Sequence, residues 1–243
     1  MQRNRGRARW VGSGTSLASQ VAALFAAGEQ GFDISDIRPE TVWQDSAKTV
    51  PGAIGQPVGY ILDKSGRGNH RVQTTTTART ILQQDSGGRC YLQFDGVDDG
   101  FGGAISGWSN SMLVASAIQP ATTAAHVLWF LSTTNLVYFG ASIGGSGSPP
   151  SANVGTPGTF VDGVQVSPDT RAALNTALGS GVTHVEDSYP LAMSAFTDLT
   201  LGNYVGFPFG GRFYGAIATV YSNPATAALI RRRLAQVSGA VLP

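Results

Sequence analysis

The heptapeptide Phe160-Val161-Asp162-Gly163-Val164-Gln165-Val166 gives the strongest local indication of the fold. Asp162 and Gly163 separate two runs that contain β-branched valines. Asp-Gly is a favoured pair for a two-residue turn because both positions can take a positive φ angle. The heptapeptide therefore predicts a tight β-hairpin, with two antiparallel strands that meet at this turn.

Short runs with strand character continue on both sides of this hairpin. None exceeds ten residues, and most are bounded by Gly, Pro, Asn, Asp or Ser, which favour turns. They are rich in the β-branched and aromatic residues that strands prefer. The runs are residues 91–94, 112–118, 127–131, 136–139, 159–161 and 212–221. This pattern predicts an all-β fold, an antiparallel β-sandwich or jelly roll.

The composition supports this fold class and excludes several others. Of the 243 residues, 32 are glycines scattered among turns rather than placed at every third position, so the chain is not collagen-like. Hydrophobic residues make up 42% of the chain, which excludes a disordered protein, and no apolar run reaches the roughly 18 residues of a membrane span. A single cysteine, Cys90, excludes an internal disulfide. We expect one large β domain without membrane insertion.

Two short helices are expected beside the strands. An N-terminal helix is predicted at residues 21–27, with Ser16 or Ser19 as its N-cap and Gly28 at its end. An inserted helix is predicted to open at residues 167–169 and to close near Gly179. Both would connect or flank strands without changing the fold class.

The C-terminal helix has the clearest boundaries in the sequence. Asn223 supplies an N-cap, Pro224 suits the first helical position, and Gly239 follows the last residue of an uninterrupted run. Its expected packing face consists of Ile230, Leu234 and Val237. The three arginines at 231–233 are expected to form a solvated face near the helix C-terminus, with an acidic partner as the alternative.

The first nine residues form a basic arm. Arg3, Arg5, Arg7 and Arg9 lie there, and the remaining residues have 12 cations and 15 anions, a net charge of −3. Arginine suits carboxylates, so the arm is interpreted as an anchor on an acidic protein surface, or alternatively as a frayed terminus. Four charges give only weak affinity for nucleic acid, which is not expected as a partner. The predicted organisation is an arm and linker at 1–23 and one domain at 24–243.

Candidate catalytic groups do not form a convincing set in the sequence. Ser142 lies in a G-x-S-x-G match at 140–144, but the following residues are not helical in character, so a strand end is favoured over a nucleophile. Glu186 and Asp187 are adjacent and would point to opposite faces of a strand. The histidines, His70, His126 and His184, are scattered. The expected protein is therefore not an enzyme.

The densest acidic cluster is Asp95-Gly96-Val97-Asp98-Asp99. Two interpretations are open for it. The carboxylates of an Asp-Gly turn can cap backbone N–H groups, which is the favoured interpretation. Alternatively Asp95, Asp98 and Asp99 bind calcium, which takes about six to eight oxygen ligands. No other cofactor is expected.

Two segments resemble the signatures of laminin-G-like, concanavalin A-like jelly-roll domains. The segment at 63–70 reads D-K-S-G-R-G-N-H, and the segment at 94–99 reads F-D-G-V-D-D. The lead-in at 24–31 and 55–59, the F-V-D-G-V hairpin at 160–164 and the strand at 210–217 are similar to those of tailed-bacteriophage virion proteins with this domain. The matching motif residues are Asp63, Ser65, Gly66, Gly68, Asn69, His70, Asp95, Gly96, Asp98 and Asp99.

The resemblance implies a concanavalin A-like jelly roll that belongs to a virion surface and has no catalytic role. Gly100 to Gly103 depart from the usual strand after F-D-G-x-D-D, and the acidic catalytic motif of the glucanase branch is absent. The motif residues are expected to form structural turns. The implied protein is a tail-fibre, spike or decoration subunit of a phage particle.

Exposed aromatic and amide side chains are the candidates for contact with a ligand or partner. Sugars stack on aromatic rings and bond to polar groups, and interfaces use the same residue types. The candidates are Trp108, Asn110, Tyr204, Phe207 and Phe209. The expected partners are other virion proteins, further copies of this chain and a host-surface glycan. For Trp108, Phe207 and Phe209, burial in the core or against a neighbouring subunit is favoured over contact with a sugar. The alternative functions are a purely structural assembly role and, least favoured, polysaccharide hydrolysis.

Overall fold

The computed structural model describes residues 15–105, 107–122, 126–132, 137–142, 154–202 and 206–243. Antiparallel strands dominate it, accompanied by three α-helices, α1 (Leu17–Ala23), α2 (Arg171–Leu178) and α3 (Pro224–Ser238). The strands are β1 (Gly31–Asp33), β2 (Val42–Trp43), β3 (Tyr60–Ile61), β4 (Arg71–Val72), β5 (Ile81–Gln84), β6 (Cys90–Asp95), β7 (Met112–Pro120), β8 (His126–Ser132), β9 (Val137–Ser142), β10 (Gly158–Val161), β11 (Val164–Gln165), β12 (His184–Leu191), β13 (Thr200–Leu201) and β14 (Gly210–Val220). Short 3-10 helices lie at Pro39–Thr41 and Thr76–Ala78.

The main sheet has eight strands and contains the predicted runs 91–94, 112–118 and 159–161 and all but the last residue of 212–221. Residues 127–131 lie in β8 and residues 137–139 in β9, while residue 136 lies outside the described residues. The strand order of the main sheet is β11-β10-β12-β7-β14-β6-β5, and β1 pairs with the second half of β14. The predicted hairpin is confirmed: β10 and β11 pair across Asp162 and Gly163, whose φ angles are 53° and 89°. Because both turn residues have positive φ, the turn matches the twist of the strands it joins.

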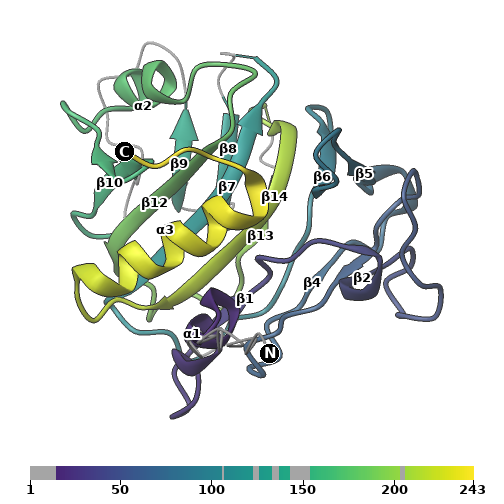
Figure 1. The fold of residues 1–243 in the computed structure, drawn as a ribbon, viewed down its shortest axis with the longest axis horizontal. Helices are drawn as coiled ribbons and strands as arrows, with labels where there is room; N and C mark the ends of the chain where they lie inside the picture. The colour runs from purple at the N-terminus through teal and green to yellow at the C-terminus, as the bar shows by residue number, and fades with distance from the viewer. Residues whose placement is uncertain (1–14, 106, 123–125, 133–136, 143–153, 203–205) are drawn as a thin grey trace, which may run out of the picture.

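Helices α3 and α1 cover one face of the main sheet (Figure 1). Side chains alternate along β7, so that Leu113, Ala115 and Ala117 face the helices. They pack with Ile230 and Leu234 of α3 and with Val21 of α1. Because alternate side chains of a strand point to opposite faces, the face under the helices is also apolar and buried, where an antiparallel sheet often has a face exposed to solvent.

Two small sheets cover the other face of the main sheet, here called the inner face. They have the orders β13-β8-β9 and β2-β3-β4. Their buried side chains join one cluster with the inward residues of β6, β7 and β14. This cluster includes Phe32, Val42, Ile61, Phe94, Val114, Trp129, Leu201 and Phe213. The main sheet is thus the middle layer between helices and smaller sheets.

The helix boundaries agree with the sequence at α3 and differ at α1 and α2. At α3, Asn223 Oδ1 accepts from Thr226 N and Gly239 closes the helix with φ 77°, as predicted. At α1, Ser16 is the N-cap, but the helix ends at Ala23, before Gly28. At α2 the predicted opening at 167–169 is wrong, because the Thr170 hydroxyl caps Ala173 N and starts the helix one turn later.

The arginine triplet of α3 is not a solvated face. Arg231 forms an ion pair with Asp187 of β12, and Arg233 is buried beside Asp36. Only Arg232 is exposed. The prediction was wrong because α3 lies across the sheet, which places two of its three consecutive arginines against other elements.

Candidate functional site

The Asp95–Asp99 turn lies where β6 ends beside the start of β14. Gly210 is paired with Asp95, and Gly96 has a φ of 77°. Asp95 N donates to Asp99 Oδ2 at 2.8 Å, and Val97 N donates to Asp95 Oδ1 at 2.8 Å. The two carboxylates therefore hold the turn by accepting backbone N–H groups.

The same turn gathers three acidic side chains. One carboxylate oxygen from each of Asp95, Asp98 and Asp99 lies within 4.8 Å of the others. Burial raises the pKa of Asp99 to about 6, with smaller contributions from the two neighbouring carboxylates. Oxygen ligands of this kind suit a calcium ion, although Asp95 and Asp99 also accept backbone bonds. The arrangement can act as a capped turn without a cation.

A hollow of about 260 Å³ lies beside the turn. Its lining combines one acidic, one imidazole and several small groups: Asp95, Gly96, Ala121, Thr122, His126, Pro208 and Gly210. The His126 ring packs edge-on against Phe209, with centroids 5.3 Å apart. We call this surface the Asp95 rim. It is a concave edge of the main sheet with polar groups at its border, which is the form of a binding surface.

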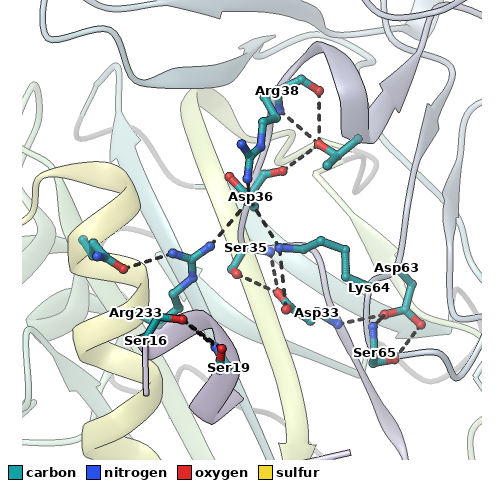
Figure 2. Close-up of polar contacts among 12 residues, drawn as sticks. Ser16, Ser19, Asp33, Ser35, Asp36, Arg38, Asp63, Lys64, Ser65 and Arg233 are labelled. Atoms are coloured by element: carbon teal, nitrogen blue, oxygen red, sulfur yellow. Dashed lines mark hydrogen bonds and ion pairs between the residues drawn. The ribbon is translucent and has the colours of Figure 1, made fainter. Parts of the chain in front are cut away.

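The loop at residues 63–70 is organised by the Asp63 carboxylate. Its two oxygens accept four hydrogen bonds, from the backbone N–H groups of Asp33, Ser65 and Asn69 and from the Ser65 hydroxyl, at 2.8–2.9 Å. Figure 2 shows this carboxylate between Ser65 and the strand that carries Asp33. A carboxylate with this many donors is a structural centre of the loop.

The remaining motif residues attach the loop to its surroundings. Gly66 and Gly68 have φ angles of 79° and 76°, which favour glycine. Asn69 Nδ2 donates to Gly31 O at 2.6 Å, so the loop is bound to β1. His70 Nδ1 accepts from Asp63 N at 3.0 Å, and burial lowers the pKa of His70. The histidine thus serves as a neutral acceptor in the loop.

A polar network that the sequence did not indicate extends from this loop to α3 (Figure 2). Lys64 Nζ lies 3.6 Å from Asp33 Oδ2 and 3.7 Å from Asp36 Oδ2. Asp36 also forms an ion pair with Arg38. The Oδ2 atom of Asp36 lies 3.6 Å from Nη2 of Arg233. These residues come from segments far apart in the sequence, and they join the loop, the chain after β1 and α3.

The predicted contact aromatics do not form an exposed patch. Trp108 is 3% exposed and Phe209 is 0% exposed, so both are core residues, as the burial interpretation predicted, and the candidate surface contact through them is corrected. Trp108 packs against Phe32, and Phe209 against Phe94, which explains why these large apolar rings are buried. Phe207 is half-buried, beside the Asp95 rim.

The other predicted contact and anchor residues are placed as follows. Asn110 is exposed, and its Oδ1 accepts from the backbone N–H and the hydroxyl of Ser194 at 3.1 and 2.6 Å. Tyr204 lies outside the described residues. The four arginines of the arm, Arg3, Arg5, Arg7 and Arg9, also lie outside them. Helix α1 packs on α3 with Val21 buried, so packing begins within the segment predicted as arm and linker.

Strand pairing brings two of the catalytic candidates together, because His126 of β8 is the Cα partner of Ser142 of β9. Ser142 is the last residue of β9, as the strand-end interpretation predicted. Glu186 is only 3% exposed. His184 Nδ1 lies 2.6 Å from Asp162 Oδ2, a pair that sequence reasoning missed because the residues are 22 positions apart. Among the described residues, no hydroxyl or thiol is hydrogen-bonded to this histidine.

Comparisons with known proteins add no family to this geometry. The chain matches no protein-family model, no curated protein and no solved structure. Within the described ranges, none of the helices combines the length and the apolar character needed to cross a bilayer.

Proposed function

We propose that this chain is a non-enzymatic structural protein of a bacteriophage virion, a tail-fibre, spike or decoration subunit. Its β domain would be a laminin-G-like, concanavalin A-like jelly roll at the particle surface. It would contact other virion proteins, further copies of itself and a host-surface glycan. The observation that supports this most is the use of the 63–70 and 95–99 segments as carboxylate-centred turns, which is the role the resemblance implies for them.

A contact role fits the described carboxylates better than catalysis does. Asp63, Asp95 and Asp99 accept backbone N–H groups. Glu186 is enclosed by the layers on either side of the main sheet. Hydrolysis of a glycosidic bond needs two carboxyl groups on opposite sides of the sugar, about 5 to 9.5 Å apart and accessible to it. Binding at a rim needs only accessible polar and apolar groups.

Assembly without a glycan is the second candidate, and the burial of Trp108 and Phe209 favours it. These rings were the stacking platforms expected for a sugar. With both in the core, contacts with protein partners would depend on the arm and on exposed loops. Nucleic acid is not proposed as a partner.

Adhesion and assembly are distinguished by two binding assays. The purified protein is incubated with particles that lack it and, in a second assay, with host cells. Binding to particles with no binding to cells or cell-surface polysaccharide supports assembly. Binding to cells in the absence of particles supports adhesion. Binding to neither contradicts the proposed function.

The arm is tested in the same particle assay. Replacing Arg3, Arg5, Arg7 and Arg9 by Gln is expected to lower incorporation strongly, because Arg–carboxylate pairing would be lost. A variant with four Lys at these positions is the matched control and is expected to retain part of the incorporation, since it keeps the charge. Unchanged incorporation of the Gln variant would refute the anchor.

A further inference from the structure

Three polar side chains form a row across the main sheet on its helix-covered face. Arg212 of β14 is paired with Gln93 of β6 on one side and with Gln119 of β7 on the other. By strand alternation, these residues share the face that carries Tyr91 and Tyr214. A hollow of about 380 Å³ opens over the row, with Pro120, Ala121, Gly181 and Gly211 completing its lining.

The Arg212 guanidinium is held in place by aromatic side chains. Its central carbon lies 4.7 Å from the centroid of the Tyr91 ring. A hydrogen-bonding contact with the Tyr214 side chain raises the pKa of Arg212. No carboxylate of the described residues lies within 4 Å of it, whereas Arg231 and Arg89 on the same side of the sheet each have an aspartate partner. Arg212 is thus a cation stacked on Tyr91 that forms no direct ion pair with the described residues, although the more distant Asp85 charge contributes to its raised pKa.

Backbone carbonyls orient the two glutamines. Gln93 Nε2 donates to Gly211 O at 3.1 Å and to Phe94 O at 3.0 Å, and Gln119 Nε2 donates to Gly181 O. The amide nitrogens are therefore occupied by protein groups. No described residue donates to either amide oxygen, so both oxygens remain available as acceptors on residues that line the hollow.

The charge of the hollow distinguishes it from its neighbours. Among the described residues, its lining has one cation and no acidic group. A hollow beside α3 has Asp36 and Glu40 together with its arginines, and another has Asp162 beside His184. An unpaired, stacked arginine suits a planar carboxylate, which it can bind through two parallel N–H groups. Two adjacent amide acceptors suit hydroxyl groups.

We propose that this hollow binds an acidic sugar residue of the uronic acid type. Its carboxylate lies on Arg212, and its hydroxyls donate to Gln93 and Gln119. The volume of about 380 Å³ is at the lower end for ligand sites, as expected for one sugar unit of a longer chain. This inference depends on the glycan-binding branch of the proposed function and specifies the chemical class of the glycan.

The test is a calorimetric titration with oligosaccharides of galacturonate, glucuronate and mannuronate at millimolar concentrations. The methyl ester of each oligosaccharide is the matched ligand, because it keeps the sugar and removes the negative charge. We expect at least one free acid to bind and its ester to bind about tenfold more weakly or not at all. Arg212→Gln is expected to lose this binding, and Arg212→Lys to retain part of it because Lys lacks the two-pronged geometry.

Arg232→Gln is the matched control, since Arg232 is exposed on α3 and lies outside the hollow. It is expected to bind the acid like the unmodified protein, and the thermal unfolding of each variant shows that it is folded. The proposal is overturned if acid and ester bind equally, if Arg212→Gln binds undiminished, or if none of the three acids binds. In any of these cases, continued binding of the protein to cells or particles would leave the proposed function standing without this ligand.

Discussion

Glu186 and Asp187 are neighbours on β12, yet they face different layers of the protein. Asp187 points toward α3 and binds Arg231 through two hydrogen bonds of 2.8 Å. Glu186 lies on the inner face, paired across the strands with Ser116 and Val161, and has no ion pair among the described residues. At this strand the helix layer brings a counter-charge to Asp187, whereas no described residue of the inner layer brings one to Glu186.

The pKa values of the two carboxyl groups reflect this difference. Burial raises the pKa of Glu186 to about 8, and the Asp187 charge adds to the effect. Burial also raises the pKa of Asp187, but Arg231 offsets part of the effect and the value is about 6. Near neutral pH, Glu186 is therefore protonated and Asp187 is charged.

Arg71 is another buried ionisable group on the inner side. It is fully buried, and burial lowers its pKa to about 10. The Nη1 atom of Arg71 donates to the carbonyl oxygens of Gly103 and Leu199. The central carbon of the guanidinium lies 4.6 Å from the centroid of the Phe32 ring. Among the described residues, its Nε and Nη2 atoms have no hydrogen-bond partner. Arg71 is thus held mainly by carbonyls and a ring, and the Asp63 charge offsets part of the lowering of its pKa.

The largest expected effect comes from Asp187→Asn. This change leaves the Arg231 guanidinium against Tyr189 and Phe160 without its carboxylate. Removing one partner of a buried pair costs about 3–5 kcal/mol. Urea unfolding near neutral pH measures this loss. A loss below about 1 kcal/mol would show that the pair behaves like an exposed one.

A smaller and pH-dependent effect is expected from Glu186→Gln. The folded-state pKa of about 8 exceeds the ordinary value of 4.5, so the folded chain retains a proton that the unfolded chain releases. The stability that this group contributes is present below pH 4.5 and is lost as the pH rises to about 8. Gln cannot ionise, so the variant is expected to equal the unmodified protein at low pH and to exceed it by a few kcal/mol at about pH 9.

Urea unfolding from about pH 5 to about pH 9 measures this difference. Asp99→Asn is the matched control. The pKa of Asp99 is raised only to about 6, so the stability difference between this variant and the unmodified protein is expected to stop changing at a lower pH. Parallel pH profiles for Glu186→Gln and the unmodified protein would mean that Glu186 is charged in the folded state.

The smallest effect is expected at the caps of the helix layer. Asn223→Ala removes the acceptor for Thr226 N, and Ser16→Ala removes the acceptor for Ser19 N. Each change is expected to cost about 1 kcal/mol, as N-cap losses do. Thermal unfolding measures both, with the exposed Arg232→Ala as the control on α3. If either cap variant equals this control, its cap bond is not stabilising.

Local features of the sequence predicted local features of the structure. The Asp162–Gly163 turn and both ends of α3 depend on residues a few positions apart. The local sequence was therefore sufficient to predict them. The pairing of Asp187 with Arg231 spans 44 positions and depends on how α3 crosses the sheet. The burial of Trp108 and Phe209 likewise depends on which layer covers them, and an aromatic residue in a loop-like segment gives no sign of this.

In the candidate site, the motif loops could be predicted from the sequence, but the residues that the fold brings next to them could not. The carboxylate-capped turn at Asp95 follows from a short-range Asp-Gly pattern. The row of Gln93, Arg212 and Gln119 comes from three strands and becomes a unit only through their register. No period or spacing in the sequence connects these residues.

The position of β14 has a consequence for synthesis of the protein. This strand, at Gly210–Val220, is bonded to β7, β6 and β1, all of which precede it in the chain. On the ribosome, the earlier strands emerge without the segment that joins them, and their unpaired edges stay available to other chains until residues 210–220 have been made. Premature termination anywhere before Gly210 would therefore release a polypeptide that lacks the centre of its sheet and is prone to aggregate.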